Sequence, residues 1–142
     1  MSFVLDNSVT MRWLMASTKA VDQQYAIEIL KSLTDQQPIV PNLWHLEVTS
    51  VLLAAEKRQQ ITSGQSEGFL IQLENIPLRV DDSTAFHAFT RTLGLARSYN
   101  LSSYDASYLE LAIRTGNPLA TLDKALVRAA KKAGVKRYLL DG

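Results

Sequence analysis

The chain contains no cysteine, and this absence excludes several kinds of site. Without thiols there is no disulfide scaffold, no thiolate-bound zinc and no cysteine nucleophile. The absence of cysteine also agrees with a reducing compartment. No apolar stretch reaches the roughly 20 residues that cross a bilayer. The segment before Asp6 has neither the basic nor the apolar part of a signal peptide. We therefore expect a cytoplasmic protein that does not enter a membrane.

Charge of one sign is also scarce, because the net charge is only +1. That balance alone argues against a nucleic-acid partner, but the distribution of charge matters more than its sum. One segment gathers six basic residues with no acid between them: Lys124, Arg128, Lys131, Lys132, Lys136 and Arg137. A solvated helix face explains this segment without any partner. Beside an acidic metal site, the segment would instead bind phosphates.

Length and composition indicate one domain that spans residues 1–142. No shift in composition divides the chain, and its 142 residues match the size of an ordinary domain. Hydrophobic residues make up 46% of the chain, enough for a substantial core, and charged residues make up 20%. We therefore expect a folded globular domain.

Short apolar runs alternate with segments of helical period. Strands are predicted at residues 3–5, 77–80, 119–121 and 138–140. Helices are predicted from residue 8, at 26–33, 42–54, 69–73, 86–96, 102–116 and 123–133, with residues 38–41 as a break and Asn42 as a cap. This order predicts an α/β fold, a three-layer α/β/α sandwich with a short, mainly parallel central sheet.

Two aspartates stand where a parallel sheet places its ligand site, beyond the carboxyl ends of the strands. Asp6 directly follows the first strand, and Asp123 follows the strand at 119–121, where a helix begins. Each has an ordinary alternative role, a turn residue for Asp6 and a helix N-cap for Asp123.

Two more carboxylates are predicted on inward helix faces. Glu47 lies four residues from both Leu43 and Val51, inside the apolar stripe predicted for its helix. Such a carboxylate is costly unless it is paired or bound to metal, and an arginine partner is the alternative. Asp105 is predicted to face the sheet, and a capping box with Ser102 is its alternative role.

Four carboxylates in one place would hold protons or push apart unless a cation binds them. Two unit charges about 4 Å apart repel by about 4 kcal/mol at an effective dielectric constant near 20. Oxygen ligands and the lack of cysteine favour Mg²⁺ or Mn²⁺ over zinc. The two histidines, His45 and His87, lack the spacing of a zinc site. Carboxylates with open metal positions are the arrangement that hydrolyses phosphodiesters.

Four segments resemble the signature segments of PIN-domain proteins, in the family's order: 4–8, 46–52, 103–112 and 119–126. The likeness extends over essentially the whole chain and is strongest to the VapC-type toxins of type II toxin–antitoxin pairs. One departure is Ser50, where related chains often carry asparagine three residues after the glutamate. This departure affects a contact near the site but leaves the acids intact.

The resemblance implies an α/β/α sandwich and an Mg²⁺- or Mn²⁺-dependent endoribonuclease that is frequently a homodimer and is inhibited by a small antitoxin. It assigns metal binding and catalysis to an acidic quartet, which consists of Asp6, Glu47, Asp105 and Asp123. The hydroxyls of Ser8 and Thr121 would orient carboxylates or water. Flanking RNA phosphates would be bound by Lys124, Arg128, Lys131 and Lys132.

Two other functions stay open at this point. The same fold would serve as a binding module that holds RNA or a protein with little turnover, its acids kept for metal-stabilised folding. A phosphate enzyme with an aspartyl nucleophile, or a phosphoacceptor switch, fits less well. Such hydrolases usually carry a second acid two residues after the first, where this chain has Ser8.

Overall fold

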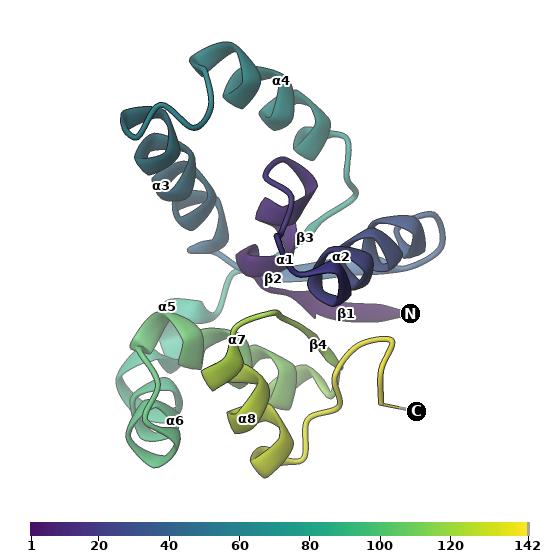
Figure 1. Ribbon diagram of the computed structural model, residues 1–142. Helices are drawn as coiled ribbons and strands as arrows, with labels where there is room; N and C mark the ends of the chain where they lie inside the picture. The colour runs from purple at the N-terminus through teal and green to yellow at the C-terminus, as the bar shows by residue number, and fades with distance from the viewer. Residues whose placement is uncertain (142) are drawn as a thin grey trace.

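The computed structural model, which describes residues 1–141, contains a four-stranded sheet in the order β3-β2-β1-β4 (Figure 1). Its strands are β1 (Ser2–Leu5), β2 (Gln37–Pro41), β3 (Arg79–Asp81) and β4 (Leu119–Ala120). All three strand pairings are parallel, with Val4 opposite both Ile39 and Leu119. The predicted α/β fold with a parallel central sheet is therefore confirmed.

Helices lie on both sides of this sheet and make the outer layers (Figure 1). The helices before β3 are α1 (Asn7–Thr10), η1 (Met11–Trp13), α2 (Ala20–Ser32), α3 (Trp44–Lys57) and α4 (Ser63–Glu74). Those after it are α5 (Thr84–His87), η2 (Ala88–Thr92), α6 (Leu93–Tyr99), α7 (Ser103–Thr115) and α8 (Lys124–Ala133). Within residues 1–141, no helix combines the length and apolar character needed to cross a membrane.

The core is built on the central strands β1 and β2 and on helix α7. Phe3, Val4 and Leu5 of β1 have no exposed surface, because helices cover both faces of the strand. Helix α7 begins where the Ser102 hydroxyl accepts the Asp105 N–H at 3.1 Å. It ends at Gly116, whose φ of +68° suits glycine. The predicted ends of this helix agree with the structure.

Strand β2 corrects the prediction that residues 38–41 only separate two helices. Its two prolines, Pro38 and Pro41, lie near the ends of the strand. A missing backbone N–H removes little of the hydrogen-bond ladder there, so both prolines are tolerated. Between them, Ile39 and Val40 are buried.

The strand predicted at residues 138–140 is wrong. After α8 the chain forms a single parallel bridge, between Leu119 and Arg137, and then turns. The Tyr138 N–H donates to the Leu119 carbonyl at 2.9 Å as part of this bridge, and the Tyr138 ring stacks on Phe3 with 3.9 Å between ring centroids. Leu139 has a φ of +67°, which is incompatible with an extended strand.

Helix α3 begins at Trp44, two residues after the predicted cap, and buries a different face from the predicted one. The Asn42 N–H donates instead to the Thr84 hydroxyl at 3.2 Å. The buried residues of α3 are Trp44, Val48, Leu52 and Ala55. Two apolar sets of helical period overlap in this helix, and the set containing the large Trp44 ring fills the core. Glu47 consequently stands half-buried at the edge of the buried face, not inside it.

The segment predicted as one helix at residues 86–96 is divided into α5, the π-helical turn η2 and α6. Two of the apolar residues that mark its period do not face the core. Phe86 is 82% exposed and Phe89 is 91% exposed. Periodicity correctly indicates helical structure here but gives the wrong inward face.

Candidate active site

Asp6 lies at the carboxyl end of β1 and is almost fully buried, with 2% of its surface exposed. Its N–H donates to the Ala120 carbonyl at 3.0 Å, which joins it to the end of β4. Its Oδ2 accepts hydrogen bonds from Ser8 Oγ at 2.7 Å and Thr121 Oγ1 at 2.8 Å. The structure thus places Ser8 and Thr121 against Asp6.

Backbone groups fix the orientation of these two hydroxyls. Ser8 Oγ accepts the Leu122 N–H at 3.0 Å, and Thr121 Oγ1 accepts the Asp123 N–H at 3.0 Å. Because each oxygen already accepts a backbone proton, each is free to donate its own proton to Asp6. The loop after β4 therefore aims both hydroxyls at one carboxylate oxygen.

Glu47 enters the site from α3 and meets Tyr108 from α7. The Tyr108 hydroxyl donates a hydrogen bond to Glu47 Oε1. Tyr108 has no exposed surface, whereas Glu47 is half-buried. Tyr108 is not among the site residues predicted from the sequence. Its position three residues after Asp105 on the same helix was an available signal, because a buried tyrosine needs a partner for its hydroxyl.

Asp105 and Asp123 each sit at the start of a helix. Asp105 is half-buried in the first turn of α7. Asp123 is the N-cap of α8, and its Oδ1 accepts the Leu126 N–H at 2.9 Å. The capping role considered for Asp123 is therefore present, and it uses one of the two carboxylate oxygens.

The four carboxylates lie near enough to influence one another. Burial raises the pKa of Asp6 to about 7, the Ser8 and Thr121 hydrogen bonds oppose the rise, and the charges of Asp105 and Glu47 add to it. Burial also raises the pKa of Glu47, and the charge of Asp105 raises it further. The pKa of Asp105 is raised by burial and by the charge of Asp123. The fold thus gathers the acidic quartet at one edge of the sheet.

Within the described part of the chain, the acidic quartet has no cationic side chain as an ion-pair partner. Among residues 1–141, no lysine, arginine or histidine forms an ion pair with any member of the quartet. Elsewhere the chain does pair its buried acids. Arg114 binds Asp81 at 2.7 Å and Glu110 at 2.8 Å, which leaves Asp81 committed to an ion pair. The arginine partner considered for Glu47 is absent from the described residues.

The donor set suits a hard divalent cation that keeps part of its water shell. In the part of the chain that is described, no three acidic or histidine side chains stand close enough to enclose a metal ion. Mg²⁺ is ordinarily held by one or two carboxylates plus waters rather than by a cage of protein ligands. Buried carboxylates with raised pKa values and no cationic partner fit such an ion.

Helix α8 starts at the site and carries most of the basic segment. Its exposed basic side chains are Lys124, Arg128, Lys131 and Lys132. Arg137 does not belong to this exposed face. Its guanidinium donates to the Thr121 carbonyl at 2.8 Å and lies 4.6 Å from the Tyr25 ring centroid. Arg137 therefore supports the loop that holds Thr121.

Comparisons with known proteins agree with this architecture. Residues 3–132 match the family model described as PIN domain. The crystal structure of PAE2754 from Pyrobaculum aerophilum is similar, with a TM-score of 0.69 over 96% of this chain and 83% of that one. Sequence identity between the two is 18%, so the likeness is one of fold. No curated protein matches the sequence.

Proposed function

Because the chain belongs to the PIN-domain family, whose members are generally nucleases, we propose that it is an Mg²⁺- or Mn²⁺-dependent endoribonuclease. The observation that carries this proposal is the acidic quartet. The charges of Asp105 and Glu47 raise the pKa of Asp6, and the charge of Asp123 raises the pKa of Asp105. No basic side chain among residues 1–141 forms an ion pair with the quartet. A divalent cation is the partner that this arrangement requires.

Asp6, Asp105 and Asp123 would hold one or two metal ions, in part through coordinated waters, and Glu47 would complete the surroundings directly or through water. When bound, the metal lowers the pKa of a coordinated water and stabilises charge on the scissile phosphate. Asp6 has a pKa of about 7 and would release its proton as the cation binds. Ser8 and Thr121 hold the Asp6 carboxylate in one orientation.

RNA would lie across the quartet with flanking phosphates on α8. The exposed side chains of Lys124, Arg128, Lys131 and Lys132 supply the positive charge for this contact. Attack by water rather than by the sugar 2′-hydroxyl would leave 5′-phosphate and 3′-hydroxyl ends. Product ends therefore distinguish this chemistry from cleavage by the RNA's own hydroxyl.

The resemblance to VapC-type toxins extends the proposal to partners. The chain would be the toxin of a toxin–antitoxin pair, would form a homodimer and would be inhibited by a small cognate antitoxin protein. A short reading frame directly upstream of the gene, able to suppress its toxicity, is the genetic arrangement that this proposal expects.

The Asp6→Asn substitution tests the proposed activity, because asparagine keeps the shape of Asp6 and removes its charge. Cleavage of single-stranded RNA in Mg²⁺ or Mn²⁺ should fall by more than about 100-fold, beyond the loss typical of residues around a metal site. Asp35→Asn, which changes an exposed aspartate away from the quartet, is the matched control and should cleave normally.

Full cleavage by Asp6→Asn, or by the wild-type chain in excess EDTA, would contradict the proposal. Retention of RNA by the wild-type chain without product over a long incubation would favour the binding module instead. Gel analysis of a labelled RNA distinguishes these results.

A further inference from the structure

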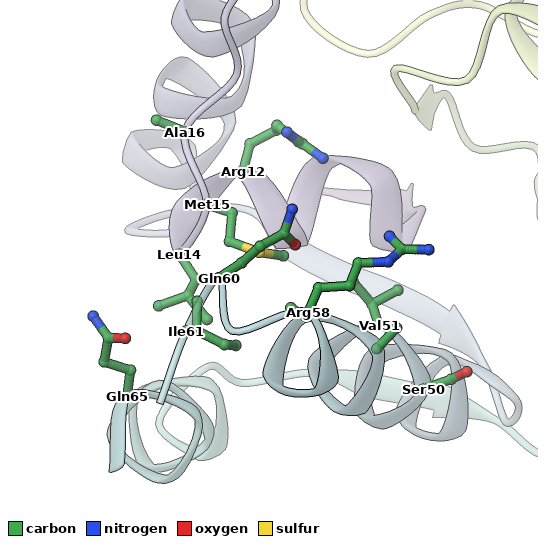
Figure 2. Close-up of a pocket in the computed structure, with 12 residues that line it drawn as sticks. Arg12, Leu14, Met15, Ala16, Ser50, Val51, Arg58, Gln60, Ile61 and Gln65 are labelled. Carbon is green, nitrogen blue, oxygen red and sulfur yellow. The ribbon is translucent and has the colours of Figure 1, made fainter. Parts of the chain in front are cut away.

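A cleft of about 760 Å³ lies between η1, the second half of α3 and the start of α4 (Figure 2). Its lining includes apolar side chains such as Leu14 and Val51 and two arginines, Arg12 and Arg58. No residue of α8 lines the cleft, so the cleft is separate from the basic face of that helix.

Both walls of the cleft belong to segments that also carry a member of the acidic quartet, although no member of the quartet lines the cleft itself. On one wall, Asp6 is followed at once by α1 and then by Arg12 in η1. On the other wall, Ser50, Val51, Ala54 and Arg58 line the cleft. These residues follow Glu47 at spacings of three and four, so they continue its face of α3. At 1.5 Å per residue, Arg58 lies about 16 Å along the helix from Glu47.

The two guanidinium groups are available for an anion. Among residues 1–141, neither Arg12 nor Arg58 forms an ion pair with a carboxylate. Figure 2 shows both side chains extending in the direction that runs along α3 from Arg58 toward Ser50. Arg12 is half-buried, and a partly buried charge without a partner favours the binding of a counter-ion. Both side chains thus point toward the first half of α3, the half that carries Glu47.

We propose that this cleft binds the RNA strand on one side of the scissile bond, with Arg12 and Arg58 on successive backbone phosphates. The inference rests on the proposed nuclease function and deepens it. A strand that crosses the quartet leaves it in two directions, and α8 provides the positive surface for only one of them. A guanidinium group binds two oxygens of one phosphate at a time, and the apolar lining, which includes Val51, would give the bases a surface away from water.

The salt dependence of RNA binding tests this assignment. The probe is a fluorescein-labelled oligouridylate about 16 nucleotides long, measured by anisotropy with Asp6→Asn protein so that it is not cut. Each phosphate contact with a single strand contributes about 0.7 to the slope of log affinity against log salt. Adding Arg12→Ala and Arg58→Ala removes two phosphate contacts, so the magnitude of that slope should decrease by about 1.4.

Two control variants accompany the double alanine variant. Lys57→Ala removes a neighbouring exposed charge that does not line the cleft, and its slope should match that of the parent protein. Arg12→Lys with Arg58→Lys keeps both charges and should keep most of the slope. In the active background, the double alanine variant should raise KM for the same RNA about tenfold and leave kcat unchanged.

An unchanged slope and KM in the double alanine variant would overturn the assignment, even if that variant lost binding to a protein partner. In that case the cleft would be a protein-docking site. Cleavage by the wild-type chain, measured in parallel, separates the two proposals. RNA cleavage with an unchanged slope rejects only the cleft assignment, whereas a lowered slope without any cleavage rejects only the nuclease.

Discussion

Three hydroxyl groups position two carboxylates of the acidic quartet. Ser8 and Thr121 donate to Asp6, and Tyr108 donates to Glu47. A hydroxyl stabilises and orients a carboxylate without neutralising its charge. The ionised carboxylates therefore remain available to a cation that comes from solution.

Tyr108→Phe tests whether the tyrosine positions Glu47 for metal binding. Phenylalanine fills the same buried space and removes only the hydrogen bond. Cleavage should fall about tenfold, the lower range for a residue that supports a metal ligand, and the Mg²⁺ concentration for half-maximal rate should rise. Tyr104→Phe, on the same helix but 62% exposed, is the control.

A purely packing role for Tyr108 would give a different result. The Tyr108→Phe variant would then be less stable but would need the same Mg²⁺ concentration as the wild-type chain. Titration of the cleavage rate with Mg²⁺, together with urea unfolding of both variants, separates the two roles.

Single residues differ in how far the sequence predicts them. The positions of Asp6 and Asp123 follow from the strands that precede them, because parallel strands end at a common edge. Tyr108 does not follow in this way, because its partner lies 61 residues away and the contact depends on how α3 and α7 meet. Arg12 and Arg58 were equally hidden, since a cleft is a property of packed elements and not of a motif.

Between elements, Arg114 joins the edge strand β3 to helix α7. Its guanidinium donates to both oxygens of Asp81 at 3.1 and 2.7 Å, and to Glu110 at 2.8 and 3.1 Å. Glu110 is only 3% exposed. These hydrogen bonds lower the pKa of Asp81. The ion pair thus fixes the end of a three-residue strand that lies at the sheet edge.

Arg114→Met should destabilise the protein strongly, because it leaves the buried Glu110 without a cation. Removing one partner of a buried ion pair costs about 3 kcal/mol or more. Arg97→Met, at an exposed position of α6, should change the free energy of unfolding by less than about 0.5 kcal/mol. Equal urea midpoints for the two variants would show that Arg114 does not hold the strand in place.

Elements with uniform patterns are predicted best from the sequence. Helix α7 has a serine cap at one end and glycine at the other, and α8 has an aspartate cap and glycine, so their bounds agree closely with prediction. Strand β2 is missed because prolines ordinarily indicate a break, although they stand at its ends. The face of α3 is wrong because two apolar stripes share the helix and only tertiary packing selects between them.

The whole molecule explains why acids far apart in sequence meet. The order β3-β2-β1-β4 places β1 beside β4, and that adjacency brings the loop after β4 against Asp6. Helix α3 lies on one side of the sheet and α7 and α8 lie on the other (Figure 1). All three helices begin near the edge where β1 ends, and each contributes one acid. Sequence patterns predict β1, β3 and β4 but not β2, and they do not give the strand order that produces this convergence.

This convergence links stability to pH with a definite sign. Asp6 has a pKa of about 7 in the folded chain and an ordinary value of 3.8. Between these values the folded state binds more protons than the unfolded state, so stability falls as pH rises. Protonated Asp6 makes its full contribution to the free energy of unfolding below pH 3.8. That contribution is lost as the pH rises through about 7. A bound cation would replace the proton and restore stability at high pH.

Urea unfolding of the wild-type chain and Asp6→Asn at pH 5 and pH 8, each in EDTA and in excess Mn²⁺, tests the central claim that these acids share a cation. In EDTA, the free energy of unfolding of the wild-type chain should fall between pH 5 and pH 8 by about 3 kcal/mol more than that of Asp6→Asn. At pH 8, Mn²⁺ at about 100 times its Kd should raise the free energy of unfolding of the wild-type chain by about 2.7 kcal/mol, and that of Asp6→Asn by much less. The same pH dependence in both proteins, with no stabilisation of either by Mn²⁺, would contradict the account.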